Sequence, residues 1–103
     1  MSGTLSKAVW CLSYFDAKKE YRDQLIAALL KLIEPTRAEL GCLQYELIVD
    51  NENPDFLIMV EKFVDQKALD HHEQQSYIKY FVENEMDRYC NKVTWNVGKE
   101  IIL

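Results

Sequence analysis

The chain has 103 residues, about the length of one domain, and a formal net charge of −5. Its twelve lysines and arginines are scattered, and nucleic-acid binding needs clustered basic residues, so a nucleic-acid partner is not expected. The three cysteines, Cys11, Cys42 and Cys90, are odd in number and show no C-x-x-C spacing, which argues against a disulfide framework and a zinc site. We expect them to be small buried residues in a reducing cytoplasm.

The segment from Met1 to Lys7 is short and polar, and no later stretch has the length of a membrane span. A cytoplasmic protein without a secretion signal or membrane segment is therefore expected. Residues 8–15 have the length and aromatic content of a β-strand. A helix is predicted from about Lys18 to Leu40, and Pro35 should kink or interrupt it. Gly41 is expected to end this helix in a left-handed conformation.

Two further strands are predicted over residues 42–49 and 56–64. The turn between them, residues 50–55, is rich in Asn, Asp and Pro, so the two strands should form an antiparallel hairpin. Asp65 is a suitable N-cap for a short helix that runs from Gln66 to His72.

Ser76 is expected to cap a second helical stretch that reaches about Tyr89. Residues 92–97 alternate polar and apolar and predict a fourth strand, followed by the tail 98–103. The order β-α-β-β-α-β is that of the ferredoxin-like fold, an α+β fold with a four-stranded antiparallel sheet and helices on one face. We predict a single domain over residues 1–103, with a core at about 8–97.

The first and third predicted strands are apolar on both sides, which a sheet covered on one face only does not require. In the first strand, Ala8, Trp10, Leu12 and Tyr14 lie on one side and Val9, Cys11 and Phe15 on the other. In the third strand, Phe56, Ile58 and Val60 oppose Leu57, Met59 and Phe63. The helices can cover only one face, so we expect a second copy of the chain to cover the other in a homodimer.

Two polar residues stand in apolar surroundings. His72 shares a helix face with Ala68 and Leu69 and should point inward, whereas His71 lies nearer the solvent. An inward histidine can serve as a base, an acid or a hydrogen-bond donor, or it can be a structural residue bonded to a backbone carbonyl. Glu61 lies within an apolar strand and needs a partner or a raised pKa. Either a functional role or a structural one, a salt bridge or hydrogen bond to a helix or to the other subunit, explains Glu61.

Aromatic residues at strand and helix spacing either line a pocket for a flat aromatic ligand or simply form the core. They are Trp10, Tyr14, Tyr45, Tyr77 and Phe81. The run Asp70 to Glu73 points in different directions around a helix, so no metal site is expected there. The sequence has no phosphate-binding glycine motif, and no cofactor is expected.

The stretch from Glu39 to Leu47, ELGCLQYEL, resembles the helix-to-strand junction of the antibiotic biosynthesis monooxygenase family. So does Glu61-x-Phe63 with the residues that follow it, Asp65, Ala68, Leu69 and His72. The resemblance covers roughly residues 8–97. It implies a dimeric α+β barrel with a pocket between sheet and helices in each subunit.

Some members of this family oxidise quinols or polycyclic phenols with O2 and use neither metal nor flavin. The resemblance therefore implies a cofactor-independent monooxygenase acting on a quinol or polyphenol, with His72 as the catalytic residue. The expected substrate-binding residues are Tyr14, Tyr45, Glu61, Phe63, Tyr77 and Phe81.

The chain also departs from the family pattern. Tyr77 stands where a second histidine often occurs, Phe63 replaces a frequent tryptophan, and residues 8–15 lack the asparagine of haem-degrading members. Haem chemistry is therefore not expected. Two other functions stay open: capture of a small aromatic ligand without turnover, as in a stress protein, and isomerisation by His72 and Tyr77.

Overall fold

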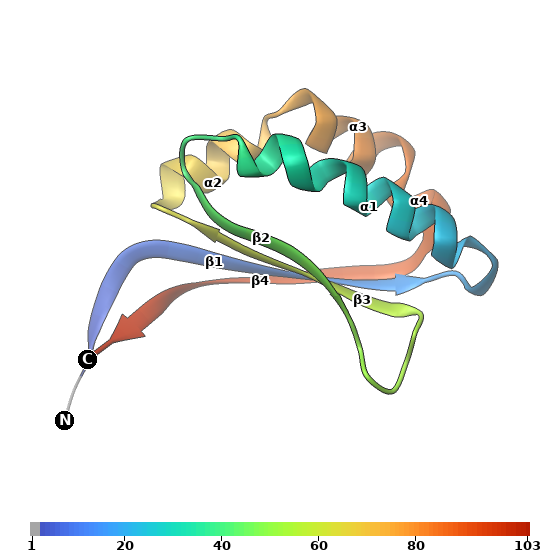
Figure 1. Cartoon of the computed structure of the whole chain (residues 1–103), viewed down its shortest axis with the longest axis horizontal. Helices are drawn as coiled ribbons and strands as arrows, with labels where there is room; N and C mark the ends of the chain where they lie inside the picture. Colours follow the sequence, from blue (N-terminus) through green and yellow to red (C-terminus); the bar gives the residue numbers. More distant parts are fainter. Residues whose placement is uncertain (1–2) are drawn as a thin grey trace.

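The fold is a four-stranded antiparallel sheet with helices on one face (Figure 1). The computed structural model describes residues 3–103, so the first two residues of the predicted domain lie outside the described part. The elements are β1 (Thr4–Ala17), the 3-10 turn η1 (Lys19–Tyr21), α1 (Arg22–Arg37), β2 (Cys42–Val49), β3 (Phe56–Phe63), α2 (Gln66–Glu73), α3 (Ser76–Asn84), α4 (Met86–Tyr89) and β4 (Cys90–Ile102). The strand order β2-β3-β1-β4 confirms the predicted ferredoxin-like α+β fold.

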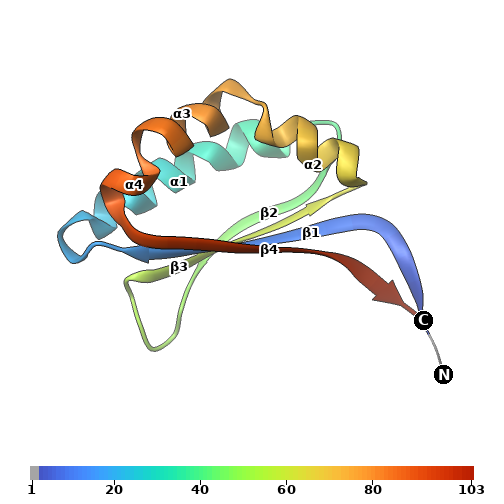
Figure 2. The same ribbon diagram turned by 180° about the vertical axis from the view of Figure 1, so that it is seen from behind.

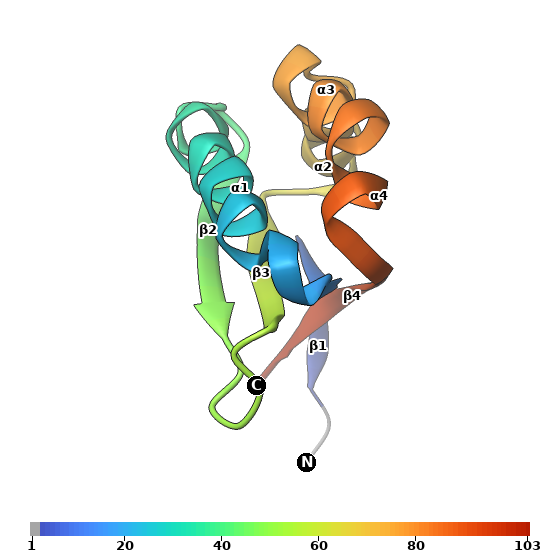
Figure 3. The same ribbon diagram turned by 90° about the vertical axis from the view of Figure 1, so that its right-hand side faces the viewer.

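The helices form one layer, with α1 lying beside the row of α2, α3 and α4 (Figure 3). Figure 2, seen from behind, shows that the opposite face of the sheet carries no helix. The core fills the space between the two layers. In β3 the residues Leu57, Met59, Glu61 and Phe63 are buried toward the helices, and the residues between them are more exposed. This alternation fixes which side chains reach the helix-covered face.

The two outer strands run beyond the predicted boundaries. β1 begins at Thr4, and β4 continues to Ile102, so the predicted tail 98–103 is mostly strand. These ends pair with each other and project past the helices (Figures 1 and 2). A bulge between Leu5 and Val9 separates this extension from the main sheet. Its side chains at Leu5, Ile101 and Leu103 are exposed.

Three predicted details of the first helix differ from the structure. α1 begins at Arg22, after η1, and ends at Arg37. Pro35 lies within α1 and does not interrupt it, since the helix continues to Arg37. The left-handed conformation predicted for Gly41 is wrong, since no glycine among residues 3–103 has a positive φ.

The second helical region is divided. Asp65 caps α2 as predicted, since its Oδ1 accepts a hydrogen bond of 2.9 Å from the Ala68 N–H. The helix predicted from Ser76 to Tyr89 breaks at Glu85 into α3 and α4. Gln75, not Ser76, is the N-cap residue of α3. Within residues 3–103, no helix combines the length and apolar composition that a membrane span needs.

Candidate active site

A cavity of about 260 Å³ lies between the helix-covered face of the sheet and the helices. Its lining is mainly apolar, with side chains from β1, β2, β3, β4 and all four α-helices. The polar groups that line it belong to Cys11, Ser13, Tyr45, Glu61, His72 and Glu73, and exposed residues such as Trp95 and Val82 stand at its edge. A concave apolar site with a few converging polar groups is the usual form of a small-molecule site.

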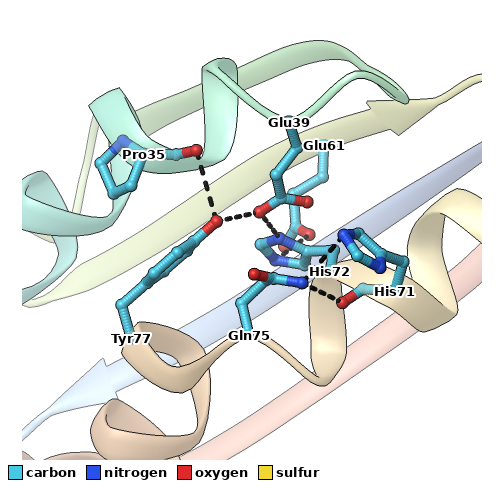
Figure 4. Close-up of polar contacts among 7 residues, drawn as sticks. All are labelled: Pro35, Glu39, Glu61, His71, His72, Gln75 and Tyr77. Atoms are coloured by element: carbon cyan, nitrogen blue, oxygen red, sulfur yellow. Dashed lines mark hydrogen bonds and ion pairs between the residues drawn. The ribbon is translucent and has the colours of Figure 1, made fainter.

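His72 is buried at this cavity, as its helical spacing predicts. It lies one turn after Leu69 on α2, and both residues are 3% exposed. The imidazole packs between two aromatic rings, with centroid distances of 5.4 Å to Tyr45 and 5.0 Å to Phe63. His71 instead faces outward and contacts Gln75 on the surface (Figure 4).

The two nitrogens of His72 face different carboxyl groups (Figure 4). Nδ1 lies 3.0 Å from Oε2 of Glu39, a hydrogen bond between two buried side chains. The same Glu39 oxygen accepts a hydrogen bond from the Tyr77 hydroxyl. Nε2 lies 3.7 Å from Oε1 of Glu61, which is too long for a hydrogen bond. His72 is thus hydrogen-bonded to a carboxylate. The structural interpretation of this histidine predicted a backbone carbonyl as its partner.

Glu61 is buried among apolar side chains. Its Oε2 accepts a hydrogen bond of 3.2 Å from the Ser13 hydroxyl. Burial raises the pKa of Glu61 to about 8; the Ser13 hydrogen bond opposes this rise, and the charges of Glu73 and Glu39 add to it. Glu61 is therefore mainly a neutral carboxylic acid near pH 7 and can give up a proton at the cavity.

The structure brings some predicted site residues to the cavity and leaves others away from it. His72, Tyr45, Glu61 and Phe81 line the cavity. Phe63 packs on the imidazole without lining the cavity. The Tyr77 hydroxyl is directed to Glu39 and to the Pro35 carbonyl.

Tyr14 lies on the opposite face of the sheet, where its ring stacks on Phe56 at 6.0 Å. The alternation of β1 requires this, because Ser13 and Phe15 line the cavity and the residue between them must point away. The structure therefore does not place Tyr14 with the other predicted substrate-binding residues.

Several polar residues at the site were not predicted from the sequence, among them Ser13 and Glu39. Ser13 shares its strand face with the apolar residues Cys11 and Phe15, and strand alternation alone was enough to find it. Glu39 stands in the family-like stretch before β2, yet its position gives no sign that it meets a histidine 33 residues later.

The thiol at the cavity is not activated. Burial and then the charge of Glu61 raise the pKa of Cys11 to about 12, so the thiol stays protonated near neutral pH. The two carboxyl groups beside His72 face opposite nitrogens of one ring, so they do not converge on a single ion position.

Residues 9–84 match the family model described as antibiotic biosynthesis monooxygenase. The chain is 32% identical to protein SO0527 from Shewanella oneidensis, whose crystal structure superposes with a TM-score of 0.94 and covers 97% of this chain and 98% of that one. PA3566 from Pseudomonas aeruginosa is 26% identical, with a TM-score of 0.86 over 95% of this chain and 98% of that chain.

An uncharacterized protein of Synechocystis sp. (strain ATCC 27184 / PCC 6803 / Kazusa), sll1783, is 33% identical over 70 residues. This match covers 68% of the chain but 48% of the cyanobacterial protein, so the chain corresponds to about half of that relative.

Proposed function

The chain belongs to the antibiotic biosynthesis monooxygenase family, and from this premise we propose that it oxidises a neutral quinol or electron-rich polyphenol with O2, without a cofactor. The observation that carries the proposal is the buried imidazole of His72, which lines an apolar cavity and has one nitrogen without a close hydrogen bond. Beside it, Glu61 offers a carboxyl group of raised pKa. A base and an acid thus stand together in a mainly apolar site.

The cavity favours an uncharged aromatic substrate. Its volume of about 260 Å³ is near the lower end for small-molecule sites, which suits one or two fused rings. The described residues that line it include Glu61 and Glu73 but neither lysine nor arginine. A carboxylated or phosphorylated phenol would bring a negative charge beside Glu73, with no lysine or arginine of the lining to pair with it.

The chemistry follows from the substrate's own electrons. Nε2 of His72 takes the phenolic proton, and the resulting anion is electron-rich enough to reduce O2. A ring carbon then bonds to one oxygen atom, and a proton from Glu61 helps the other oxygen leave as water. In sum, a hydroquinone and O2 give a hydroxyquinone and water, and the substrate supplies all four electrons that reduce O2.

Oxygen consumption with a panel of hydroquinones and polycyclic phenols tests this function. We expect uptake that depends on the protein and falls about 100-fold or more in His72→Ala, since general base catalysis contributes about 10²–10⁴ in rate. His71→Ala is the matched control, because this neighbour faces outward on the same helix. Lack of oxygen uptake above the protein-free rate across the panel would refute the function.

The isomerase alternative gains no support from the geometry. Tyr77 is not among the residues that line the cavity, and its hydroxyl donates to Glu39. Burial, together with the Glu39 contact, also raises the pKa of Tyr77. A proton shuttle between His72 and Tyr77 across a bound substrate is therefore not favoured.

We also propose that the protein works as a homodimer. The sheet face away from the helices carries a patch of seven partly exposed apolar residues, here called the bare-face patch. Its members are Trp10, Leu12, Tyr14, Ile48, Phe56, Ile58 and Val60. A second copy packed sheet against sheet would remove this patch from water. The β1–β4 extension bends toward the same side and could lie on the partner (Figure 1).

A further inference from the structure

Behind His72, on the side away from the cavity, stands a second buried carboxylate. Glu39 does not line the cavity, yet its Oε2 lies 3.0 Å from Nδ1 of His72. The two side chains are 7% and 4% exposed. Its other oxygen, Oε1, is buried and has no hydrogen-bond partner within the described part of the chain. A buried carboxylate with so few hydrogen-bond donors around it is a strong acceptor for an N–H of the imidazole.

Glu39 is held in place from several directions. Its backbone N–H donates to the Thr36 carbonyl at 3.0 Å, and its own carbonyl accepts from the Cys42 N–H at 3.1 Å. Its side chain accepts a hydrogen bond from the hydroxyl of Tyr77 on α3 (Figure 4). The end of α1, the start of β2 and helix α3 therefore all fix the position of one carboxylate oxygen.

The geometry selects one form of the imidazole. A neutral histidine carries its proton on one nitrogen only, and a carboxylate can only accept. The hydrogen bond to Glu39 therefore requires the proton on Nδ1 and leaves the lone pair on Nε2. Nε2 is the nitrogen on the side of Glu61, which lines the cavity. A histidine in this form is ready to accept a proton from a ligand bound there.

We propose that Glu39 is a positioning residue that holds His72 as the Nδ1–H tautomer, with the Nε2 lone pair directed to the cavity. The role of this tautomer in catalysis rests on the proposed function, but the test of the tautomer does not. When a phenol O–H breaks, its proton goes to Nε2 and the electron pair stays on the phenolate oxygen. The imidazolium that forms is then paired with the Glu39 carboxylate at Nδ1. The reverse transfer restores the starting tautomer.

The direct test is the nitrogen NMR spectrum of protein labelled with ¹⁵N-histidine, recorded without substrate. The chain has only two histidines, so a His71→Gln variant assigns both rings. We expect Nδ1 of His72 to be the protonated nitrogen in neutral solution, and the exposed ring of His71 to serve as an internal reference. A protonated Nε2 with a bare Nδ1 in the unaltered protein would overturn the inference, whatever the activity.

Glu39→Gln separates positioning from mere packing. The amide has nearly the same shape but can also donate to Nδ1, so both tautomers of His72 become accessible. We expect a mixed tautomer population and a fall of about 100-fold in kcat with little change in KM, because the ring still fits but is wrongly protonated. Glu34→Gln, an exposed change on α1, is the matched control. An unchanged tautomer in Glu39→Gln would contradict the inference.

Tyr77→Phe provides a second variant if Glu39→Gln does not fold. It keeps the Glu39 carboxylate and removes a competing donor to it, so we expect the Nδ1–H tautomer of His72 to persist. A switch to the Nε2–H tautomer in this variant would contradict the inference. If the tautomer is as expected but no phenol drives oxygen uptake, the proposed function fails and the assignment of Glu39 stands.

Discussion

Glu61 links the site to the stability of the protein. In the folded protein its pKa is raised to about 8, from an ordinary value of 4.5, because it is buried. Between these two pH values the native state holds a proton that the unfolded chain has lost. The free energy of unfolding therefore falls as the pH rises through this window, by about 1 kcal/mol per pH unit. Below pH 4.5 both states are protonated and this slope vanishes.

Glu61→Gln should remove this pH dependence. We expect the free energy of unfolding of the variant, relative to that of the unaltered protein, to rise by about 3 kcal/mol between pH 5 and pH 8. Urea denaturation measures this difference. The matched control is Glu34→Gln, since that carboxylate is exposed on α1. Parallel stability curves for Glu61→Gln and the unaltered protein would show that the carboxyl ionises normally.

At this scale the sequence predicts what depends on local periodicity. The inward direction of His72 follows from its spacing to Leu69 along one helix, and the burial of Glu61 follows from the alternation of its strand. The partner of His72 does not follow, because Glu39 is 33 positions away and reaches it only where the segment between α1 and β2 lies beside α2. Local pattern fixes a direction, whereas tertiary packing chooses the contact.

At the scale of the elements, Gly41 allows α2 to approach the start of β2. A Cβ atom built on Gly41 would lie 2.3 Å from the Cβ of Ala68, which is too close for two non-bonded carbon atoms. The Gly41 carbonyl also accepts a hydrogen bond of 2.9 Å from the Val64 N–H. The absence of a side chain at Gly41 thus sets the distance between α2, which carries His72, and the segment that carries Glu39.

Gly41→Ala should be destabilising by about 1–3 kcal/mol, because the added methyl group overpacks this contact. Gly98→Ala is the control, since no atom lies within 4 Å of its added Cβ. Ala68→Gly in the Gly41→Ala background removes the clashing atom and should recover part of the loss, which a double-mutant cycle measures. Equal stability of Gly41→Ala and the unaltered protein would refute the packing role.

Element type and order could be predicted from periodicity, but several boundaries could not. The ends of β1 and β4 lack a clear alternating pattern and become strands by pairing with each other across a bulge. The break at Glu85 divides an otherwise helical pattern where the chain turns from α3 toward β4. For Gly41 the residue type was recognised as a special position, but close approach, not backbone conformation, is the reason.

At the scale of the whole molecule, the proposed homodimer covers the bare-face patch. Leu12 lies near its centre, beside Val60 of β3 and Asn96 of β4. We expect about twice the mass of one chain in sedimentation at micromolar concentration, and a monomer for Leu12→Glu, because a charge would be buried between two sheets. Leu30→Glu on α1, where the side chain is exposed, should leave the mass unchanged. A compact monomer for the unaltered chain would contradict the dimer.

In the proposed reaction, O2 reacts with a substrate held against His72 and one oxygen atom enters the product. The most direct measurement is turnover of a hydroquinone under ¹⁸O2 in ordinary water. The product is reduced at once, to stop exchange of its carbonyl oxygens with water, and its mass is measured by mass spectrometry. We predict one ¹⁸O atom in each product molecule, formed by the unaltered protein and not by His72→Ala. Unlabelled quinone with accumulating hydrogen peroxide, or substrate recovered intact, would contradict a monooxygenase.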